Sequence, residues 1–391
     1  MSKYISILIG LFLLGNAFAL PIGVKDVPVA THPPIEKANE FYQKGLEALV
    51  NNNLLKAEQA FNQSLEIYPD AANAILGLAE VEFNRGALTK AKSLLDKALI
   101  VEPRNAHIHM TLGRYFRLQK LHKRAMDSFQ KTIQLDNNFA VAYVAIGDLH
   151  LMVFNEPSKA IDNYKKAIVI DPQNAASHYA LGIAFHKNKD DINATQELEK
   201  SAQLDKTNPL PYIETARIYQ AQGKADNALQ YAEKAIERQP NSLSGNLLYA
   251  DILVRLGRVN DAEREYLKLI KANEKGPVPR ESLAMLYQQL GKLDKAEKYY
   301  RSVISLRKSS ALSSNNLAWL LAGKEKTLEE ALGFAQNAVR LRPENADYYD
   351  TLGSIQQKLG ALKEACKNLS KAVSLDPGSA SIHERWAMYC K

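Results

Sequence analysis

Two histidines stand close enough in the sequence to suggest a metal site. His107 and His109 are two residues apart, and positions two apart on a helix point about 200° from each other. They cannot share one ion without other ligands, and no Cys or Asp/Glu cluster lies nearby in the sequence. The sequence also lacks the G-x-S-x-G motif of serine hydrolases, the H-E-x-x-H motif of zinc proteases, and the glycine-rich loops that bind phosphates or dinucleotides. The sequence therefore predicts no catalytic residue, no metal site, no cofactor and a protein that is not an enzyme.

The overall charge does not indicate a nucleic-acid site either. Lys and Arg number 50 against 43 Asp and Glu, which leaves a net charge of +7 along 391 residues. Nucleic-acid binders usually concentrate such an excess in one patch or stripe, and no run of basic residues occurs here. The apolar fraction of 46% is too high for a chain that stays disordered. We therefore expect a folded protein whose partner is not a nucleic acid.

The N-terminus has the pattern of an export signal. Lys3 precedes an almost unbroken apolar run over residues 4–14, and residues 17–19 read Ala-Phe-Ala, a small-x-small cleavage pattern. We predict a signal peptide over residues 1–19 and a proline-rich linker over 20–35. The apolar run is about half of what a membrane-spanning helix needs, so we expect an exported protein without a stable span, periplasmic if the source is Gram-negative. An uncleaved anchor or a buried helix is the alternative.

Beyond residue 35 the chain repeats itself. Two columns of small residues recur every 34 or 35 positions. The first column consists of Gly45, Ala79, Gly113, Gly147, Gly182, Ala216, Ala250, Ala284, Ala318, Gly353 and Ala387. The second, made only of alanine, consists of Ala57, Ala91, Ala125, Ala160, Ala194, Ala228, Ala262, Ala296, Ala331 and Ala365. In six repeats a proline follows twelve residues later, where it would end one unit before the next.

The spacing around these columns predicts paired helices. The apolar residues recur with helical spacing, and the small residues let two helix axes approach closely. One hairpin of helices cannot bury its own apolar faces, so successive hairpins must stack. Two repeats carry one extra residue, near 155–158 and 322–327, between the two helices. The stack is predicted to bend at 276–279, where Gly-Pro-Val-Pro places two prolines around one residue.

The columns and their period resemble the tetratricopeptide repeat (TPR) family, and the N-terminal signal suggests an exported bacterial type. The resemblance covers residues 36–377 as ten repeats, and residues 378–391 resemble the solvating helix that caps such arrays. It implies an all-α fold, an α-solenoid of about ten TPR helix hairpins forming a right-handed superhelix with a C-terminal capping helix. It also implies protein binding rather than catalysis.

Two cysteines form a candidate pair. Cys366 lies on the second helix of the last repeat and Cys390 near the end of the capping helix, where adjacent helices of such an array should pack. An exported protein reaches a compartment in which disulfides form. The bond would pin the capping helix, and two separate buried thiols are the alternative.

In the resembling family the first helices of the hairpins line a concave groove that holds partner segments. By that resemblance the groove positions here are Tyr42, Leu46, Leu76, Phe83, Met110, Arg114, Arg117, Tyr179, Ile183, His186, Ile213, Arg217 and Trp319, with Val144, Leu151, Asn315 and Gln357 at further positions of the same kind. Packing between helices is the alternative role for any one of them. As a set, they suit an apolar or amphipathic segment that carries a few acidic groups.

The resemblance therefore implies a non-catalytic scaffold or assembly factor that binds protein or peptide segments. Chaperone-docking members hold a carboxylate with Lys and Asn, but the matching positions here carry Tyr42, Leu46, Leu76 and Met110. Exported arrays of this kind resemble assembly factors for pilus or exopolysaccharide secretion machines, so a role in envelope biogenesis is the main hypothesis. Two alternatives stay open. One is a self-assembling scaffold, and the other is a glycan-binding adaptor that uses Trp319, Tyr42 and Tyr179 as aromatic platforms.

Overall fold

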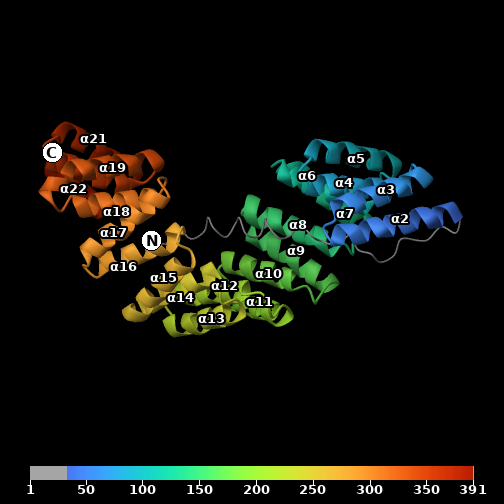
Figure 1. Cartoon of the computed structure of the whole chain (residues 1–391), viewed down its shortest axis with the longest axis horizontal. Coiled ribbons are helices and arrows are strands. Elements are labelled where there is room, and N and C mark those ends of the chain that lie inside the picture. Colours follow the sequence, from blue (N-terminus) through green and yellow to red (C-terminus); the bar gives the residue numbers. More distant parts are fainter. Residues whose placement is uncertain (1–32, 391) are drawn as a thin grey trace. The chain divides into compact units, whose positions relative to one another are not determined.

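The computed structural model describes residues 33–390, and within that range it contains helices and no strand. The chain forms one compact unit up to Lys206 and a second from Thr207. The first unit contains α2 (Pro33–Val50), α3 (Leu54–Ile67), α4 (Ala72–Asn84), α5 (Leu88–Val101), α6 (Ala106–Leu118), α7 (His122–Leu135), α8 (Ala140–Asp148), η1 (Leu149–Val153), α9 (Pro157–Ile170), α10 (Ala175–Lys187) and α11 (Asp191–Leu204) (Figure 1). The second contains α12 (Leu210–Ala221), α13 (Ala225–Arg238), α14 (Leu243–Arg255), α15 (Val259–Ala272), α16 (Pro277–Gln289), α17 (Leu293–Leu306), α18 (Ala311–Leu321), η2 (Glu325–Thr327), α19 (Leu328–Leu341), α20 (Ala346–Lys358), α21 (Leu362–Leu375) and α22 (Ala380–Cys390). Successive helices pair into five hairpins in the described part of each unit, and α22 follows the last.

This architecture confirms the predicted all-α solenoid, while the handedness of its superhelix stays a prediction. The predicted signal peptide over 1–19 lies outside the described residues. The predicted end of the linker at residue 35 is wrong by three residues, because α2 already begins at Pro33. Proline suits the first turn of a helix, since its fixed φ is helical and the missing N–H would have no partner there.

A residue in the left-handed region ends the first helix of nine hairpins. In the second unit this residue is always glycine, with φ between 68 and 81° at Gly223, Gly257, Gly291 and Gly360. In the first unit it is Gly86 once, and otherwise Asn52, Lys120, Asn155 and Lys189. Glycine adopts this conformation freely because it has no Cβ, so the first unit uses less favourable residues at most of its turns.

The two extra residues found in the sequence change the helix type near the turns. In the fourth hairpin the first helix ends in the π-helix η1 (Leu149–Val153), and a π-turn takes up one additional residue. In the ninth hairpin the connection contains the 3-10 helix η2 (Glu325–Thr327). The first insertion therefore lies a few residues before the predicted stretch 155–158, and the second lies within 322–327.

The two columns of small residues meet inside the hairpins. All ten alanines of the second column are fully buried. In the first column, a Cβ added at Gly113 would lie 2.3 Å from the ring of Phe129, and one added at Gly147 would lie 2.6 Å from Tyr164. Glycine is therefore required at both positions, because a large ring on the second helix fills the space that its side chain would need.

The joint between hairpins carries a recurring hydrogen bond. Each proline that stands two residues after a second helix has its carbonyl outside the helical hydrogen-bond pattern, and here a side chain in the next helix bonds it. These bonds join His109 to Pro103 (2.9 Å), His178 to Pro172 (3.1 Å), Asn246 to Pro240 (2.8 Å) and His383 to Pro377 (3.0 Å). Each donor follows its proline by six residues, so the same contact ties the end of one hairpin to the next.

The predicted bend at residues 276–279 does not interrupt the packing. Gly276 is the N-cap residue of α16, and Pro277 occupies the first turn of that helix. One buried apolar cluster continues across this joint from Ala250 to Ile355. The two prolines therefore start a helix in register with its neighbours.

Candidate partner-binding surface

Most of the predicted groove residues are packed between helices. Eight are buried, namely Tyr42, Leu46, Leu76, Phe83, Met110, Tyr179, Ile183 and Ile213. Tyr42 is an example, because its ring lies 5.9 Å from that of Phe61 and burial raises its pKa to about 12. Their burial gives the assignment of these eight side chains to a partner-binding surface no support, and it stays a prediction. Tyr42 and Tyr179 are also lost as glycan platforms, which leaves Trp319.

The three predicted arginines are already engaged by carboxylates. Arg114 donates to Glu80 at 2.7 Å, and Thr111 donates to the same Glu80 oxygen. The Arg114 guanidinium also lies over the ring of Phe83, 4.9 Å from its centre. Because Glu80 is buried, its charge needs this partner, so the pair belongs to the fold.

The other two arginines are also paired with carboxylates. Arg117 lies 3.5 Å from Asp148, whose other oxygen accepts from Tyr164 at 2.8 Å. Arg217 donates to the buried Glu214 at 2.8 Å. The positive charges that the sequence seemed to offer to an acidic partner are therefore neutralised within the described residues.

Trp319 is the predicted groove residue with the greatest exposure. Its side chain is 55% exposed on α18, and Leu312 stands seven residues earlier on the same helix face, also exposed. Val278 on α16 and Met388 on α22 are exposed large apolar residues at equivalent places of the first helices. We call Val278, Leu312, Trp319 and Met388 the Trp319 surface. His186 is exposed as well, but its Nδ1 lies 2.6 Å from Asp191.

Unpaired acceptor atoms lie beside the Trp319 surface. Asn315, three residues after Leu312, and Asp350 on α20 each hold one enclosed side-chain oxygen without a hydrogen-bond donor among the residues that the structure describes. The other Asp350 oxygen is 3.1 Å from Arg385 of α22. Burial raises the pKa of Asp350 above its ordinary value, and the Arg385 charge partly offsets this effect.

This raised pKa predicts a pH-dependent stability. The folded protein binds the Asp350 proton more tightly than the unfolded chain, so the contribution is present below the unfolded-state pKa and is lost as pH rises through the folded-state pKa. Asp350→Asn stays neutral at every pH. We expect its melting temperature, relative to the wild type, to rise as the pH increases above the ordinary aspartate pKa of about 3.9. Asp294→Asn, at a side chain that is 97% exposed, is the matched control, and an equal trend in both variants would contradict the assignment.

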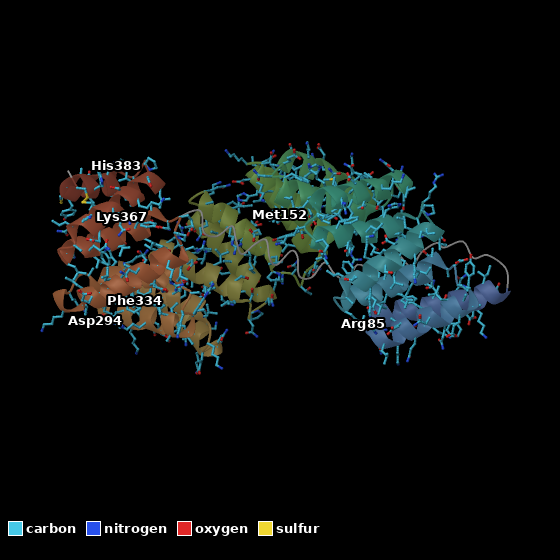
Figure 2. The ribbon with its side chains drawn as sticks, turned by 90° about the horizontal axis from the view of Figure 1, so that it is seen from above. Arg85, Met152, Asp294, Phe334, Lys367 and His383 are labelled. Carbon is cyan, nitrogen blue, oxygen red and sulfur yellow. A yellow bond between two sulfur atoms is a disulfide. The ribbon has the colours of Figure 1, made fainter. Side chains whose placement is uncertain are left out.

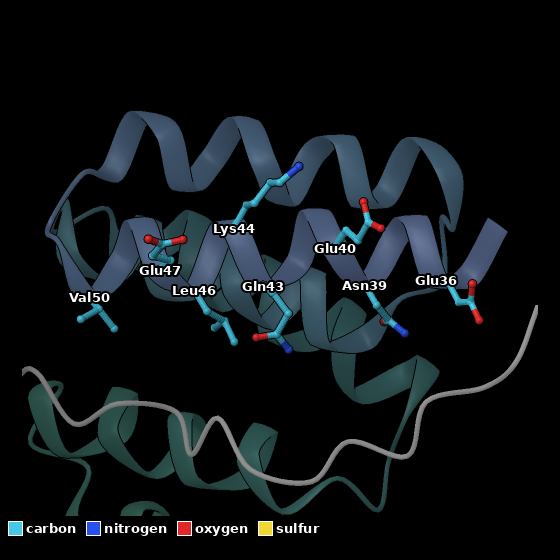
Figure 3. A pocket seen from close by; sticks show the side chains of 8 residues that line it. All are labelled: Glu36, Asn39, Glu40, Gln43, Lys44, Leu46, Glu47 and Val50. Atoms are coloured by element: carbon cyan, nitrogen blue, oxygen red, sulfur yellow. The ribbon is translucent and has the colours of Figure 1, made fainter. Parts of the chain in front are cut away.

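Two clefts occur elsewhere on the described surface. One, of about 830 Å³, runs along α2 and is lined by Glu36, Asn39, Glu40, Gln43, Lys44, Leu46, Glu47 and Val50 (Figure 3). The other, of about 710 Å³, lies between α17 and α19 and includes Arg301, Lys308 and Phe334, the last labelled in Figure 2. The first is lined by one helix and three of its eight side chains are glutamates. Neither resembles the apolar, enclosed cavity typical of a small-molecule site.

The histidine pair is used in packing. The His107 ring meets Phe139 edge-on, with 4.9 Å between centres, and burial lowers its pKa while Asp136 opposes that shift. His109 bonds the Pro103 carbonyl, as described above. Among residues 33–390 no group of three His, Cys, Asp or Glu side chains is placed to hold a metal ion.

The two cysteines meet at the C-terminal end of the second unit. The structure joins Cys366 of α21 to Cys390 of α22 by a disulfide, with the Cα atoms 5.3 Å apart. Beside it, Trp386 donates from its indole nitrogen to Ser370 at 2.9 Å. The bond and this contact both tie α22 to α21.

Several surface residues were missed from the sequence. Met388 stands at the same register as Trp319, so its period could have revealed it. Val278 and Leu312 lie six residues before the first column, a register at which no groove residue was predicted. The Glu80–Arg114 pair had a signal too, because the two residues are separated by one 34-residue period. No sequence signal indicates that one Asp350 oxygen lacks a hydrogen-bond donor, because this depends on which of its two oxygens Arg385 contacts.

Comparison with known proteins agrees with this repeat pattern. Family models described as tetratricopeptide repeat match residues 48–115 and 219–280, and residues 281–310 and 346–379. A model described as TPR repeat matches residues 155–189. Together these matches cover more than half of the chain. In the described part of the chain, no helix is both long and apolar enough to cross a membrane.

Similar proteins come from distant organisms. A TPR repeat-containing protein of Methanocaldococcus jannaschii is 26% identical, over 88% of this chain and 68% of its own length. Anaphase-promoting complex subunit 3 of Schizosaccharomyces pombe is 23% identical, over 69% of this chain and 38% of its own length. Among solved structures, yeast Tom70 is 15% identical with a TM-score of 0.53, covering 90% of this chain and 94% of that one. Pseudomonas aeruginosa pilF is 21% identical with a TM-score of 0.50, covering 57% of this chain and 100% of that one. With its repeated hairpins, its buried alanine column and these matches, the chain belongs to the tetratricopeptide repeat family.

Proposed function

We propose that this chain is a non-catalytic scaffold that binds a segment of a partner protein on the Trp319 surface. The observation that carries the proposal is the 55% exposure of Trp319. Trp is strongly enriched among residues that dominate binding energy, and apolar side chains gathered on one face mark interaction sites. Leu312 is exposed on the same face of α18, and Val278 on α16 and Met388 on α22 are exposed at equivalent positions.

The chemistry beside Trp319 indicates the character of the partner segment. Arg114, Arg117 and Arg217 are engaged by carboxylates, so they give no support to an acidic partner. The acceptors without donors on Asn315 and Asp350 are enclosed, so a partner does not reach them. A segment that presents apolar side chains would therefore complement this surface.

We also propose that the partner belongs to the cell envelope and that the scaffold serves a pilus or polysaccharide secretion machine. The support is the export-signal pattern of residues 1–19 together with the absence of catalytic motifs from the sequence. Fold similarity alone does not assign a function, so the partner has to be captured directly.

A photo-crosslinking residue placed at position 319 tests the proposal in cells. We expect a crosslink to a defined segment of an envelope protein. Leu362, which is also 55% exposed, gives the matched control position and should yield no such product. With the purified segment, Trp319→Ala should weaken binding by about 30-fold, the loss typical of an aromatic hot spot. Equal products from both positions, or unchanged affinity in the alanine variant, would refute the surface; a cytosolic partner would refute the envelope role alone.

A further inference from the structure

We propose that three turns of the first unit form a second surface, which attaches the protein to membranes rich in anionic lipid. The turns end α6, η1 and α10, the first helices of three successive hairpins. We call their side chains Leu118, Lys120, Leu121, Lys123, Met152, Val153, Phe154 and Lys189 the turn patch. This surface is separate from the Trp319 surface, and the proposal does not depend on partner binding there.

The apolar part of the turn patch is exposed and clustered. Its five apolar side chains are each 37 to 45% exposed. Three of them, Met152, Val153 and Phe154, are consecutive, and they lie at the end of the π-helix η1 or directly after it (Met152 is labelled in Figure 2). Apolar side chains that gather on a soluble surface instead of being scattered singly indicate contact with a partner or a membrane.

Contacts between the helices hold the three turns side by side. Arg117, next to Leu118, lies 3.5 Å from Asp148, which directly precedes η1. Lys187 at the end of α10 donates to the Leu151 carbonyl at 3.3 Å and approaches the Met152 sulfur at 3.9 Å. The turn patch is therefore one continuous surface made by neighbouring hairpins.

Two lysines of the turn patch, Lys120 and Lys189, have a left-handed backbone conformation, which residues with a Cβ disfavour. Lys120 and Lys189 have φ of 57° and 64°, where a Cβ approaches the following carbonyl oxygen. The same position carries glycine at four turns of the second unit. Backbone geometry alone would favour glycine here too, so the positive charge is the property that these two residues add.

These charges are available to a ligand. Lys120, Lys123 and Lys189 are exposed and form no ion pair with any residue that the structure describes. The carboxylates nearby are already engaged. Glu156 contacts His150 and Lys159, at 2.7 and 2.9 Å.

Two acids at the third turn are engaged as well. Asp191 contacts His186, and Asp190 caps α11 by accepting from the backbone of Asn193 at 3.2 Å. These acids keep their negative charge, so the excess of positive charge lies at the first turn, where residues 117–124 contain four basic and no acidic side chains.

Exposed apolar side chains surrounded by free lysines match the chemistry of an anionic bilayer surface. The apolar groups enter the boundary between headgroups and acyl chains, and the lysines are attracted to the anionic headgroups. Turns at helix ends can meet a flat surface, whereas a peptide segment is better served by a groove. The geometry thus favours a lipid surface over an acidic peptide.

Vesicle co-sedimentation of the full chain tests the proposal. We expect binding to phosphatidylcholine vesicles that contain phosphatidylglycerol, weaker binding at high salt, and little binding to phosphatidylcholine alone. The double variant Lys120→Gly/Lys189→Gly should reduce partitioning about 25-fold, which is about fivefold for each lysine. Its melting temperature should not fall, because glycine relaxes both turns.

Two further variants separate charge from insertion. Met152→Ser/Phe154→Ser should also reduce binding but leave its salt dependence in place. Asn52→Gly makes the same backbone change at another left-handed turn, with φ of 53°, and removes no charge, so it should bind like the wild type. The proposal is overturned if the wild type does not sediment with the anionic vesicles, or if the folded double-glycine variant binds as well as the wild type.

Discussion

Replacing Phe129 with alanine is expected to lower the free energy of unfolding by about 3–5 kcal/mol, the usual cost of emptying a buried ring site. Phe129 is fully buried on α7, and its ring lies where a Cβ on Gly113 of α6 would stand. The space that it leaves borders two helices fixed by their neighbours in the stack, so collapse should be limited. Urea unfolding followed by circular dichroism measures the effect.

The same contact predicts that the effect of Gly113→Ala on the free energy of unfolding depends on whether Phe129 is present. Gly113→Ala alone should cost about 1–3 kcal/mol because its methyl group overlaps the ring. In the Phe129→Ala background it should cost nothing, or stabilise the helix by up to about 1 kcal/mol, since alanine is a better helix former than glycine. Gly333→Ala, where an added Cβ meets nothing within 4 Å, is the control and should be stabilising in both backgrounds. Additive effects of the Gly113 and Phe129 changes would contradict the packing described here.

Removing the disulfide should be the second large effect. Cys366 and Cys390 are separated by 24 positions, and closing a loop of that size stabilises a fold by about 3 kcal/mol in the chain-entropy model. We expect Cys366→Ser/Cys390→Ser to lose about this amount at the C-terminal end of the second unit. The loss should be local, because each hairpin of a repeat array is stabilised mainly by its neighbours.

Trp386 gives a local measure of this change. Its indole bonds Ser370 across α21 and α22, so release of α22 should shift its fluorescence to the red. Measured in a Trp319→Phe background, the serine variant should release α22 at a lower urea concentration than the oxidised protein. Reducing agent should reproduce the shift in the wild-type cysteines and have no effect on the serine variant. Identical midpoints would show that helix packing alone holds α22.

The hairpins could be predicted from the sequence because their packing requires the same residue types in every repeat. Gly113 and Ala125 illustrate the reason, since two helices can approach closely only where both side chains are small. A requirement that recurs every 34 residues is visible without coordinates. The bend at residues 276–279 stays a prediction, although Pro277 starts α16 and does not interrupt a helix.

The exposed residues were predicted less well, because residues at the same register of the repeat differ in burial. Ile183 and Trp319 each follow the small residue of the first column by one position, yet Ile183 is buried and Trp319 is 55% exposed. The period identifies the position on the helix, but the side chains of the neighbouring helices decide how much of that position is covered. Ion pairs raise a further difficulty, because the charge of Arg114 is cancelled by a residue of another repeat.

The buried alanine column also bears on the direction of the proposed Trp319 surface. Ala296 is fully buried between α16 and α17, so its single methyl group limits how closely these helices approach. A bulkier residue there would tilt α17 relative to α16, and the later helices of the same unit would rotate with it. Trp319 and Met388 would then point in a new direction, while their contacts with neighbouring residues stayed the same. Interior substitutions could thus change the direction of the proposed Trp319 surface without altering any residue on it.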